Sequence, residues 1–400
     1  MRVAKTTARA VNGLTARWAG VSEGGTAFSA AGVWPLLAHL AEGAEGAARA
    51  ELAEALGLPA WQATDAAREL LAAMGAMRGL DAALGLWTKR TLELGHDWEA
   101  GLPADAHGIL TGDPVADRQA LDAWTVKRTG GLIDRMPVTL SEDTQMVLAS
   151  ALTMRTQWLR PFHEVELETA YEPWATRPRL GLRRSSAVLD RVGVADTPGG
   201  HVTELKVLGS NALDVHLLLG EEPMKPGQVL GAGVDILAGR YAVVPGPRLP
   251  YGYVGPGLRV EKVRCTRPEP PWLDVTTVAY HMNASHDLLR LHRLFGLTTA
   301  CDASRGHFPG ISGFPLAIGS AEQNIMARFG ALGFEAAALT AFDVVAGGLS
   351  DLRYVTKGIT ADFDRPFGFL ALHRHTRLVL TAGWVTDPLP SPEYDWEDEP

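Results

Sequence analysis

Cysteine is nearly absent from this chain of 400 residues, which contains only Cys265 and Cys301. A small fold held together by several disulfides is therefore excluded, and we expect both thiols to be reduced. No apolar run approaches the roughly 20 residues of a transmembrane helix, so no membrane association is expected. The first residues lack the apolar run of a secretory signal peptide, and this predicts a cytoplasmic protein.

Positive charge is also scarce. Lysine and arginine number 37 against 46 acidic residues, which gives a net charge of -9 at pH 7. No basic patch is rich enough to predict nucleic acid as a partner. Much of the negative excess lies in the last residues, and we interpret 389–400 as an acidic tail that is either solvated or docked on the body. Its acidic residues are Glu393, Asp395, Glu397, Asp398 and Glu399.

Apolar residues, at 46% of the chain, are abundant enough to form a large core. The high content of alanine, glycine and arginine is typical of bacterial proteins. Helical spacing of apolar residues in the first third contrasts with short apolar runs further along, and no βαβ alternation is visible, so we expect an α+β fold. The expected helices are 11–18, 33–40, 43–58, 65–77, 121–128 and 288–295. The expected strands are 82–86, 146–154, 202–208, 213–219, 325–332, 367–372 and 378–385. The segment 220–257, rich in glycine and proline, is predicted to be a long irregular excursion.

The most unusual stretch follows the strand expected at 325–332. It consists mainly of small residues, and composition alone favours a short alanine-rich helix. Alternation favours a strand instead, because Phe334, Ala336, Ala338 and Thr340 would share one face and the acidic residues would share the other. The residues are Gly333, Phe334, Glu335, Ala336, Ala337, Ala338, Leu339, Thr340 and Ala341.

Seven short segments, in order from about residue 27 to residue 388, carry motifs that occur together in one family. They are Phe28-Ser29; Trp124, Thr129, Gly131 and Ile133; Ser150-Ala151-Leu152 through Trp158-Leu159-Arg160-Pro161-Phe162; His307-Phe308-Pro309-Gly310-Ile311-Ser312; the stretch from Gly333 to Ala341; Arg365-Pro366-Phe367; and Gly383-Trp384-Val385-Thr386-Asp387-Pro388. Together they resemble the serpin family, whereas 164–275 matches it poorly.

The resemblance implies one serpin domain over 1–388, with a large mixed central sheet, further sheets, a helical N-terminal region and an exposed reactive-centre loop. The hinge and this loop would occupy 333–363. It implies an inhibitor of serine-type endopeptidases: the protease cuts the loop, forms an acyl-enzyme, and is trapped when the freed loop inserts into the central sheet. The chain would be a monomer and not an enzyme, would use no cofactor or metal, and would form a covalent complex with its target. Most of the family acts outside cells, which is the alternative to a cytoplasmic location.

The chain departs from the family pattern where the sheet would open. Phe334 stands where the hinge usually has threonine, and overpacking by its ring could cost roughly 1–3 kcal/mol on insertion. The polar residues that the family places beneath the opening are also changed. By resemblance, the sheet-opening region here comprises Gly32, Trp34, Ser150, Trp158 and Gln323. These departures leave open a non-inhibitory serpin with a binding or regulatory role.

The position of the cleaved bond follows from the resemblance in two ways that disagree. Counting forward from Gly333 places it after Gly347, whereas counting back from Pro366 places it after Val355, so the loop carries an insertion of about eight residues. We expect cleavage within Ala346, Gly347, Gly348 and Leu349. Arg353, Tyr354 and Val355 are the less favoured candidates.

Two other patterns have simpler interpretations. The segment Gly20-Val21-Ser22-Glu23-Gly24 fits the turn of a serine hydrolase nucleophile, but that turn needs a preceding strand, and here a helix is predicted. We interpret it as a glycine-rich turn, with a hydrolase acting through Ser22 as the alternative. His373 and His375 share one face of a strand, yet no further metal ligands accompany them, so we expect no metal site.

Overall fold

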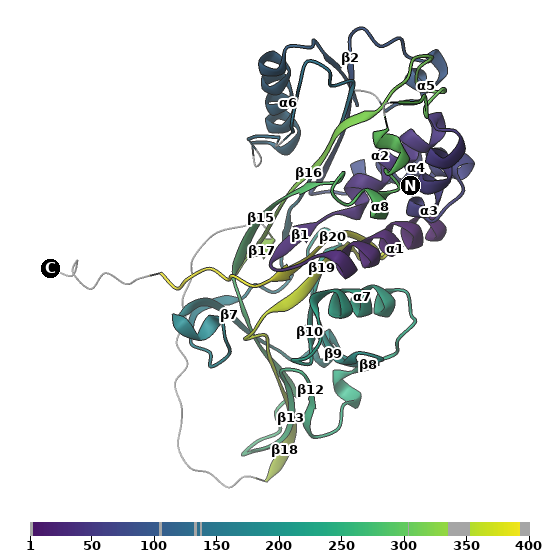
Figure 1. The fold of residues 1–400 in the computed structure, drawn as a ribbon. Coiled ribbons are helices and arrows are strands. Elements are labelled where there is room, and N and C mark those ends of the chain that lie inside the picture. The colour runs from purple at the N-terminus through teal and green to yellow at the C-terminus, as the bar shows by residue number, and fades with distance from the viewer. Residues whose placement is uncertain are drawn as a thin grey trace, which may run out of the picture.

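The computed structural model describes residues 3–103, 106–131, 134–136, 138–302, 304–334 and 353–392, which form three β-sheets with most helices gathered at one end (Figure 1). The arrangement is α+β, as the sequence predicts. The helices are α1 (Lys5–Val21), α2 (Ala30–Gly43), α3 (Gly46–Leu56), α4 (Ala60–Gly75), α5 (His96–Gly101), α6 (Pro114–Thr129), α7 (Pro226–Leu237) and α8 (His292–Phe295). Among the described residues, no helix is both long and apolar enough to cross a membrane.

The main sheet has the strand order β3-β2-β4-β16-β17-β5, and β15 pairs with β16 outside this path. Its long central strands β4 and β16 are parallel neighbours. The strands are β2 (Leu80–Lys89), β3 (His107–Leu110), β4 (Met146–Met154), β5 (Thr156–Gln157), β15 (Tyr280–Asp287), β16 (Ile318–Phe329) and β17 (Gly333–Phe334).

Strand β4 is buried on both faces because helices cover both sides of the main sheet. Met146, Leu148 and Leu152 point into the large core beneath α2. Val147 and Ala149 point the other way, into a smaller core against α6. This explains the continuous apolar run of 146–154, which the sequence correctly assigns to a central strand.

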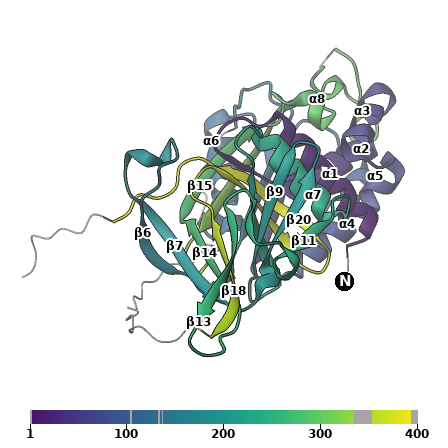
Figure 2. The same cartoon turned by 90° about the horizontal axis from the view of Figure 1, so that it is seen from below.

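The second sheet has the order β1-β20-β19-β10-β9-β8-β11, and the third has the order β12-β13-β18-β14-β7-β6. Figure 2 shows β6, β7, β14, β18 and β13 of the third sheet together at one end of the molecule. The second sheet contains β1 (Thr26–Phe28), β8 (Val192–Thr197), β9 (Gly200–Val207), β10 (Leu213–Gly220), β11 (Val243–Pro245), β19 (Phe367–His373) and β20 (Leu378–Val385). The third contains β6 (His163–Leu167), β7 (Arg179–Ser186), β12 (Gly252–Gly255), β13 (Leu258–Cys265), β14 (Trp272–Val278) and β18 (Tyr354–Asp362).

The prediction that 220–257 is irregular is wrong, because this segment contains helix α7 and the strands β11 and β12. The glycines that indicate a loop in the sequence are contact points of α7. A Cβ on Gly227 would lie 2.7 Å from the carbonyl oxygen of Ala19 in α1, and one on Gly233 would lie 2.2 Å from Leu218 Cδ1 in β10. Glycine at these positions lets the helix approach its neighbours closely.

Three expected boundaries also move. The helix expected at 288–295 is only α8, His292–Phe295, because Asp287 caps a turn before it by accepting the N–H of Leu289 at 2.9 Å. The strand expected at 325–332 begins earlier, at Ile318, and ends at Phe329. At the C-terminus, Leu389 remains part of the body, since its N–H donates to the oxygen of Ala279 at 2.8 Å.

Candidate functional site

The seam between β4 and β16 is the first component of the candidate site. The two strands pair in parallel from Ile318↔Met146 to Ile325↔Leu152, with one irregularity near the start. Within the described residues, no strand lies between them. A strand inserted between β4 and β16 would break the ladder of hydrogen bonds that joins them and would form one ladder with each. The sheet would therefore gain backbone hydrogen bonds.

The short strand β17 lies at the end of this seam. Phe334 pairs antiparallel with Phe329 of β16 on one side and with Thr156 of β5 on the other. Strand β5 follows β4 directly in the chain, so β17 occupies a position between the continuations of the two central strands. A Cβ on Gly333 would lie 2.2 Å from the carbonyl oxygen of Thr156, which explains why glycine stands there.

The ring of Phe334 is accommodated in the core. Only 2% of the residue is exposed, and its ring centroid lies 6.3 Å from that of Phe369 in the second sheet. The bulky side chain at this hinge position therefore already has a buried, apolar environment in the described state. The sequence motif predicted that Phe334 lies at the hinge, but it did not predict that the ring packs in the core.

Trp158 fixes the turn that leads into β17. Its indole Nε1 donates to the oxygen of Gly330 at 2.9 Å, and its main-chain N–H donates to the oxygen of Leu332 at 2.9 Å. Its ring centroid lies 4.9 Å from that of Phe329. Trp158 therefore belongs to the site, at the end of the seam where β17 enters.

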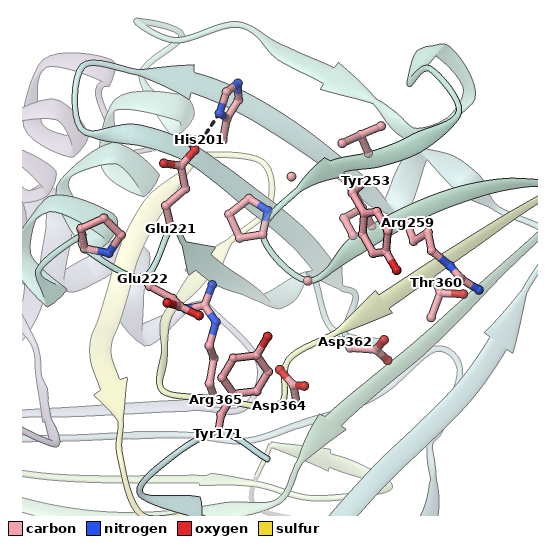
Figure 3. A pocket seen from close by; sticks show the side chains of 16 residues that line it. Tyr171, His201, Glu221, Glu222, Tyr253, Arg259, Thr360, Asp362, Asp364 and Arg365 are labelled. Atoms are coloured by element: carbon pink, nitrogen blue, oxygen red, sulfur yellow. Dashed lines mark hydrogen bonds and ion pairs between the residues drawn. The ribbon is translucent and has the colours of Figure 1, made fainter. Parts of the chain in front are cut away.

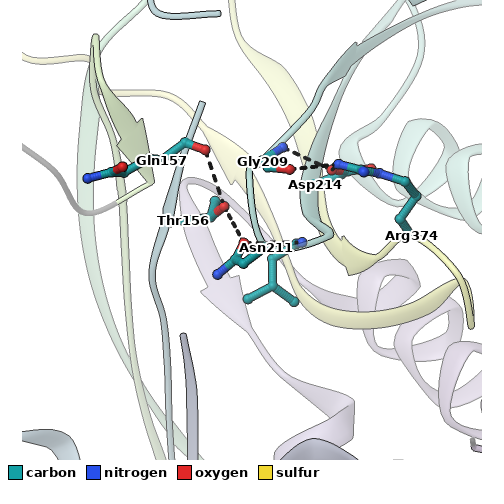
Figure 4. A network of polar contacts seen from close by, with 7 residues as sticks. Thr156, Gln157, Gly209, Asn211, Asp214 and Arg374 are labelled. Carbon is teal, nitrogen blue, oxygen red and sulfur yellow. Dashed lines mark hydrogen bonds and ion pairs between the residues drawn. The ribbon is translucent and has the colours of Figure 1, made fainter. Parts of the chain in front are cut away.

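A polar network ties this end of the main sheet to the second sheet (Figure 4). Thr156 Oγ1 donates to Asn211 Oδ1 at 2.5 Å. Beside it, Arg374 forms two hydrogen bonds of 2.7 and 2.6 Å with Asp214, which also accepts the N–H of Gly209 at 3.0 Å. The carboxylate of Asp214 raises the pKa of Arg374. The sequence analysis missed this network, because its members are far apart in the chain and resemble ordinary turn residues.

The middle of the seam rests on the N-terminus of α2. The main-chain N–H of Ser29 donates to Gln323 Oε1 at 2.7 Å, and Gln323 Nε2 donates to the oxygen of Ser29 at 2.8 Å. Gly32 lies beneath Ser150, where a Cβ would come within 2.6 Å of the serine Oγ. The structure thus brings together Gly32, Ser150 and Gln323 of the predicted sheet-opening region, and adds Ser29.

Trp34 does not belong to this cluster, although the resemblance placed it there. Its Nε1 donates to the oxygen of Leu56 at 3.0 Å, at the end of α3. On a helix, residues two positions apart point in different directions, so Trp34 and Gly32 cannot both face the seam. Trp34 instead joins α2 to α3.

Comparisons with known proteins agree with this geometry. Residues 7–172 match the family model described as Serpin (serine protease inhibitor). Serpin-Z6A of Oryza sativa subsp. japonica is 26% identical over 389 residues, which cover 91% of this chain and 94% of the rice protein. In sequence the chain is thus similar to serpins over most of its length.

Solved structures show that this chain has the serpin fold. Human thyroxine-binding globulin in complex with thyroxine aligns with a TM-score of 0.72 at 17% identity, over 96% of this chain and 98% of that chain. Mouse protein-Z dependent protease inhibitor aligns with a TM-score of 0.71 at 13% identity, over 96% of this chain and 97% of that chain. Serpins are generally protease inhibitors rather than enzymes.

Most residues proposed for the hinge and the cleaved bond lie outside the described part of this chain. They are Glu335, Ala336, Ala337, Ala338, Leu339, Thr340, Ala341, Ala346, Gly347, Gly348 and Leu349. Of the less favoured cleavage candidates, Tyr354 and Val355 are paired with Cys265 and Arg264 of β13, and Arg353 directly precedes this strand. The segment between β17 and β18 therefore spans 335–353, and not the whole of 333–363.

The remaining sequence signals have structural explanations. Ser22 follows helix α1, whereas the turn of a hydrolase nucleophile follows a strand. The Ser22 hydroxyl donates to the oxygen of Trp18 at 2.9 Å. His373 and His375 lie with ring centroids 5.5 Å apart, and no group of metal-ligating side chains occurs among the described residues. Cys265 is buried, Cys301 is exposed, and both are free.

A cavity of about 970 Å³ lies between the second and third sheets (Figure 3). Its charged groups are mostly satisfied within the protein. His201 Nδ1 lies 2.8 Å from Glu221 Oε1, and Arg365 donates to the oxygen of Gly220 at 2.7 Å. Burial raises the pKa values of Asp362 and Asp364, which project from the end of β18 toward the cavity. The mixture of acids and arginines favours no single class of ligand.

Proposed function

We propose that this chain inhibits serine-type endopeptidases as a suicide substrate, through insertion of its cleaved loop into the main sheet. The protease serine would attack a carbonyl carbon in the segment 335–353, which breaks the peptide bond and forms an ester between the two proteins. The segment upstream of the cut would then enter the seam between β4 and β16. The attached protease would be carried with it before the ester is hydrolysed.

The position of β17 carries this proposal. Strand β17 already runs antiparallel to β16 and β5, between the continuations of the two central strands. Because β4 and β16 are parallel to each other, a continuation of β17 would be antiparallel to both. The residues that follow Phe334 are small, so they would make ladder hydrogen bonds at little steric cost; each such bond contributes about 0.5–1.5 kcal/mol.

The experiment is incubation of the chain with trypsin-, chymotrypsin-, elastase- and subtilisin-like proteases, read on a denaturing gel. We expect an SDS-stable complex with at least one of them and a higher melting temperature after loop cleavage. Mass spectrometry of the released C-terminal fragment identifies the cleaved bond. Cleavage with neither a complex nor a gain in melting temperature would refute the proposal.

A matched pair of variants tests insertion separately from cleavage. The alternation of the hinge places Ala338 on the core-facing side of an inserted strand and Ala337 on the opposite side. We expect Ala338→Arg to be cut without trapping the protease, because a buried guanidinium would oppose insertion. Ala337→Arg should still form the complex.

The bonds between Gln323 and Ser29 favour one alternative, a serpin that binds or regulates without inhibition. They hold β16 on α2 and oppose opening of the seam. In that case the loop would be cut without trapping, and the melting temperature would not rise. A thermal melt of the nicked protein therefore distinguishes the two functions.

A further inference from the structure

A second, smaller cavity of about 150 Å³ lies between the second and third sheets, beside the segment that follows β5. Four cationic side chains line it: Arg160 from that segment, Arg184 from β7, Arg191 from the 3-10 turn directly before β8, and Lys206 from β9. Among the described residues no carboxylate lines this cavity, in contrast to the larger cavity described above. Such a concentration of positive charge is unusual in a protein with a net charge of -9.

Two of these cations have acidic partners and two do not. Arg191 lies 3.1 Å from Asp190, and Lys206 lies 3.4 Å from Glu204. Arg184 donates to the main-chain oxygen of Arg160 at 2.9 Å, and Arg160 donates to Ser186 Oγ at 3.0 Å. In the described part of the chain, neither Arg160 nor Arg184 forms an ion pair with a carboxylate. Their positive charges are thus uncompensated.

Arg184 is held firmly in this position. Its guanidinium carbon lies 4.2 Å from the centroid of the Phe162 ring, which fixes the plane of the group. Burial, followed by the nearby charges of Arg160 and Arg191, lowers the pKa of Arg184 to about 10. Both causes disfavour the charged guanidinium, and an anion placed between these arginines would reverse the effect.

Apart from Ser186, the rest of the cavity lining is apolar. Leu159, Val188, Leu208, Leu273 and Val275 provide it, and Leu273 and Val275 are buried. A ligand that matches this cavity has a charged end for the arginines and an apolar body for the aliphatic side chains. A hydrated inorganic ion would satisfy only the first requirement.

We propose that this cavity binds a small organic anion, namely a carboxylate, sulfate or phosphate monoester that carries a compact apolar group. The charged end lies between Arg160 and Arg184, within reach of Ser186. The apolar group packs on Leu273 and Val275. The proposal does not rest on protease inhibition, because none of the described residues that line the cavity belongs to the segment between β17 and β18.

The test is isothermal titration calorimetry of the full chain with three probes: phenyl phosphate, inorganic phosphate and phenol. We expect saturable binding of phenyl phosphate, binding of inorganic phosphate at least tenfold weaker, and no saturable binding of phenol. Equal affinity for the two phosphates, or equal affinity for phenol and phenyl phosphate, would overturn the proposed ligand class. The absence of saturable phenyl phosphate binding would overturn the site itself.

Variants locate the binding. Arg184→Gln and Arg160→Gln should each weaken phenyl phosphate binding at least tenfold, whereas Arg184→Lys should weaken it less than Arg184→Gln. Arg183→Gln is the matched control, because this arginine precedes Arg184 on β7 and points to the opposite face. Undiminished binding by both glutamine variants would overturn the assignment. If Arg184→Gln does not fold, the Arg160→Gln variant tests the proposal instead, because Arg160 is exposed.

Discussion

The side chain of Gln323 forms two hydrogen bonds with the main chain of Ser29. Its Oε1 accepts the Ser29 N–H at 2.7 Å, and its Nε2 donates to the Ser29 oxygen at 2.8 Å. Both partners are buried: 1% of each residue is exposed. One side chain on β16 thereby satisfies two main-chain groups at the start of α2. The main sheet and the helix beneath it are coupled through this single residue.

Gln323→Ala should therefore destabilise the protein. It leaves the buried N–H of Ser29 without a partner, which costs about 1–3 kcal/mol, and it removes one hydrogen bond to the Ser29 oxygen. We expect a lower urea midpoint for the variant. Gln119→Ala, on the exposed surface of α6, is the control and should leave the midpoint unchanged. Equal midpoints for the two variants would contradict the coupling.

Glu322 makes stability depend on pH. It lies directly across from Asp287 in the β15–β16 pair, and burial together with the Asp287 carboxylate raises its pKa to about 8, against the opposing effect of Arg290. The folded protein thus keeps a proton on Glu322 that the unfolded chain has already lost. This contribution to stability is complete below about pH 4.5, the ordinary pKa, and is lost as the pH rises through about 8.

Glu322→Gln removes this dependence. Urea midpoints measured between pH 5 and pH 9 should show the stability of the variant rising relative to the natural protein up to about pH 8, the pKa of Glu322 in the folded protein, and no further relative gain above it. Glu69→Gln, on the exposed side of α4, should show no such trend. A difference between Glu322→Gln and the natural protein that stays constant with pH would show that Glu322 titrates normally.

Phe334 contributes to stability before any loop insertion. Phe334→Ala removes a ring that is 98% buried against the second sheet, and such truncations cost about 3–5 kcal/mol. Phe314→Ala serves as the control, because 55% of Phe314 is exposed. Chemical denaturation of the uncleaved protein should show a large loss of unfolding free energy for Phe334→Ala and a small loss for Phe314→Ala. Similar losses would mean that the Phe334 ring does not pack as described.

Arg374 compensates a buried charge. Asp214 is 1% exposed, and Arg374→Gln would leave its carboxylate without a cation, which costs about 3–5 kcal/mol. Arg240→Gln breaks a surface ion pair with Asp235, worth at most about 1 kcal/mol. We expect the unfolding free energy to fall several times more for the first variant. A double variant, Arg374→Gln with Asp214→Asn, should recover part of the loss.

The sequence predicted those parts of the fold in which periodicity and turn residues agree. Strand β4 was found with its full length, because 146–154 is apolar throughout and buried on both faces. The first half of β16 was missed, because Ser320, Glu322, Gln323 and Asn324 are buried polar residues whose partners lie on distant segments. Helix α7 was missed because its glycines suit close packing and also suit loops.

The candidate site was predicted in part, for the same reason. The resemblance indicated Gly333, Phe334, Ser150 and Gln323, and the structure places all four along or at the end of the seam between β4 and β16; their role in sheet opening stays a prediction. The ties to Ser29 and the Asp214–Arg374 network depend on contacts between residues more than a hundred positions apart. No local pattern encodes such pairs, and the four cations of the smaller cavity likewise come from separate elements between Arg160 and Lys206.

The two chain ends produced by cutting between β17 and β18 would differ greatly in freedom. Strand β18 lies inside the third sheet, paired with β13 over eight positions and with β14 over five. Strand β17 has only two residues. The downstream end would stay anchored while the upstream end could leave, so any displacement of a bound partner has a built-in direction.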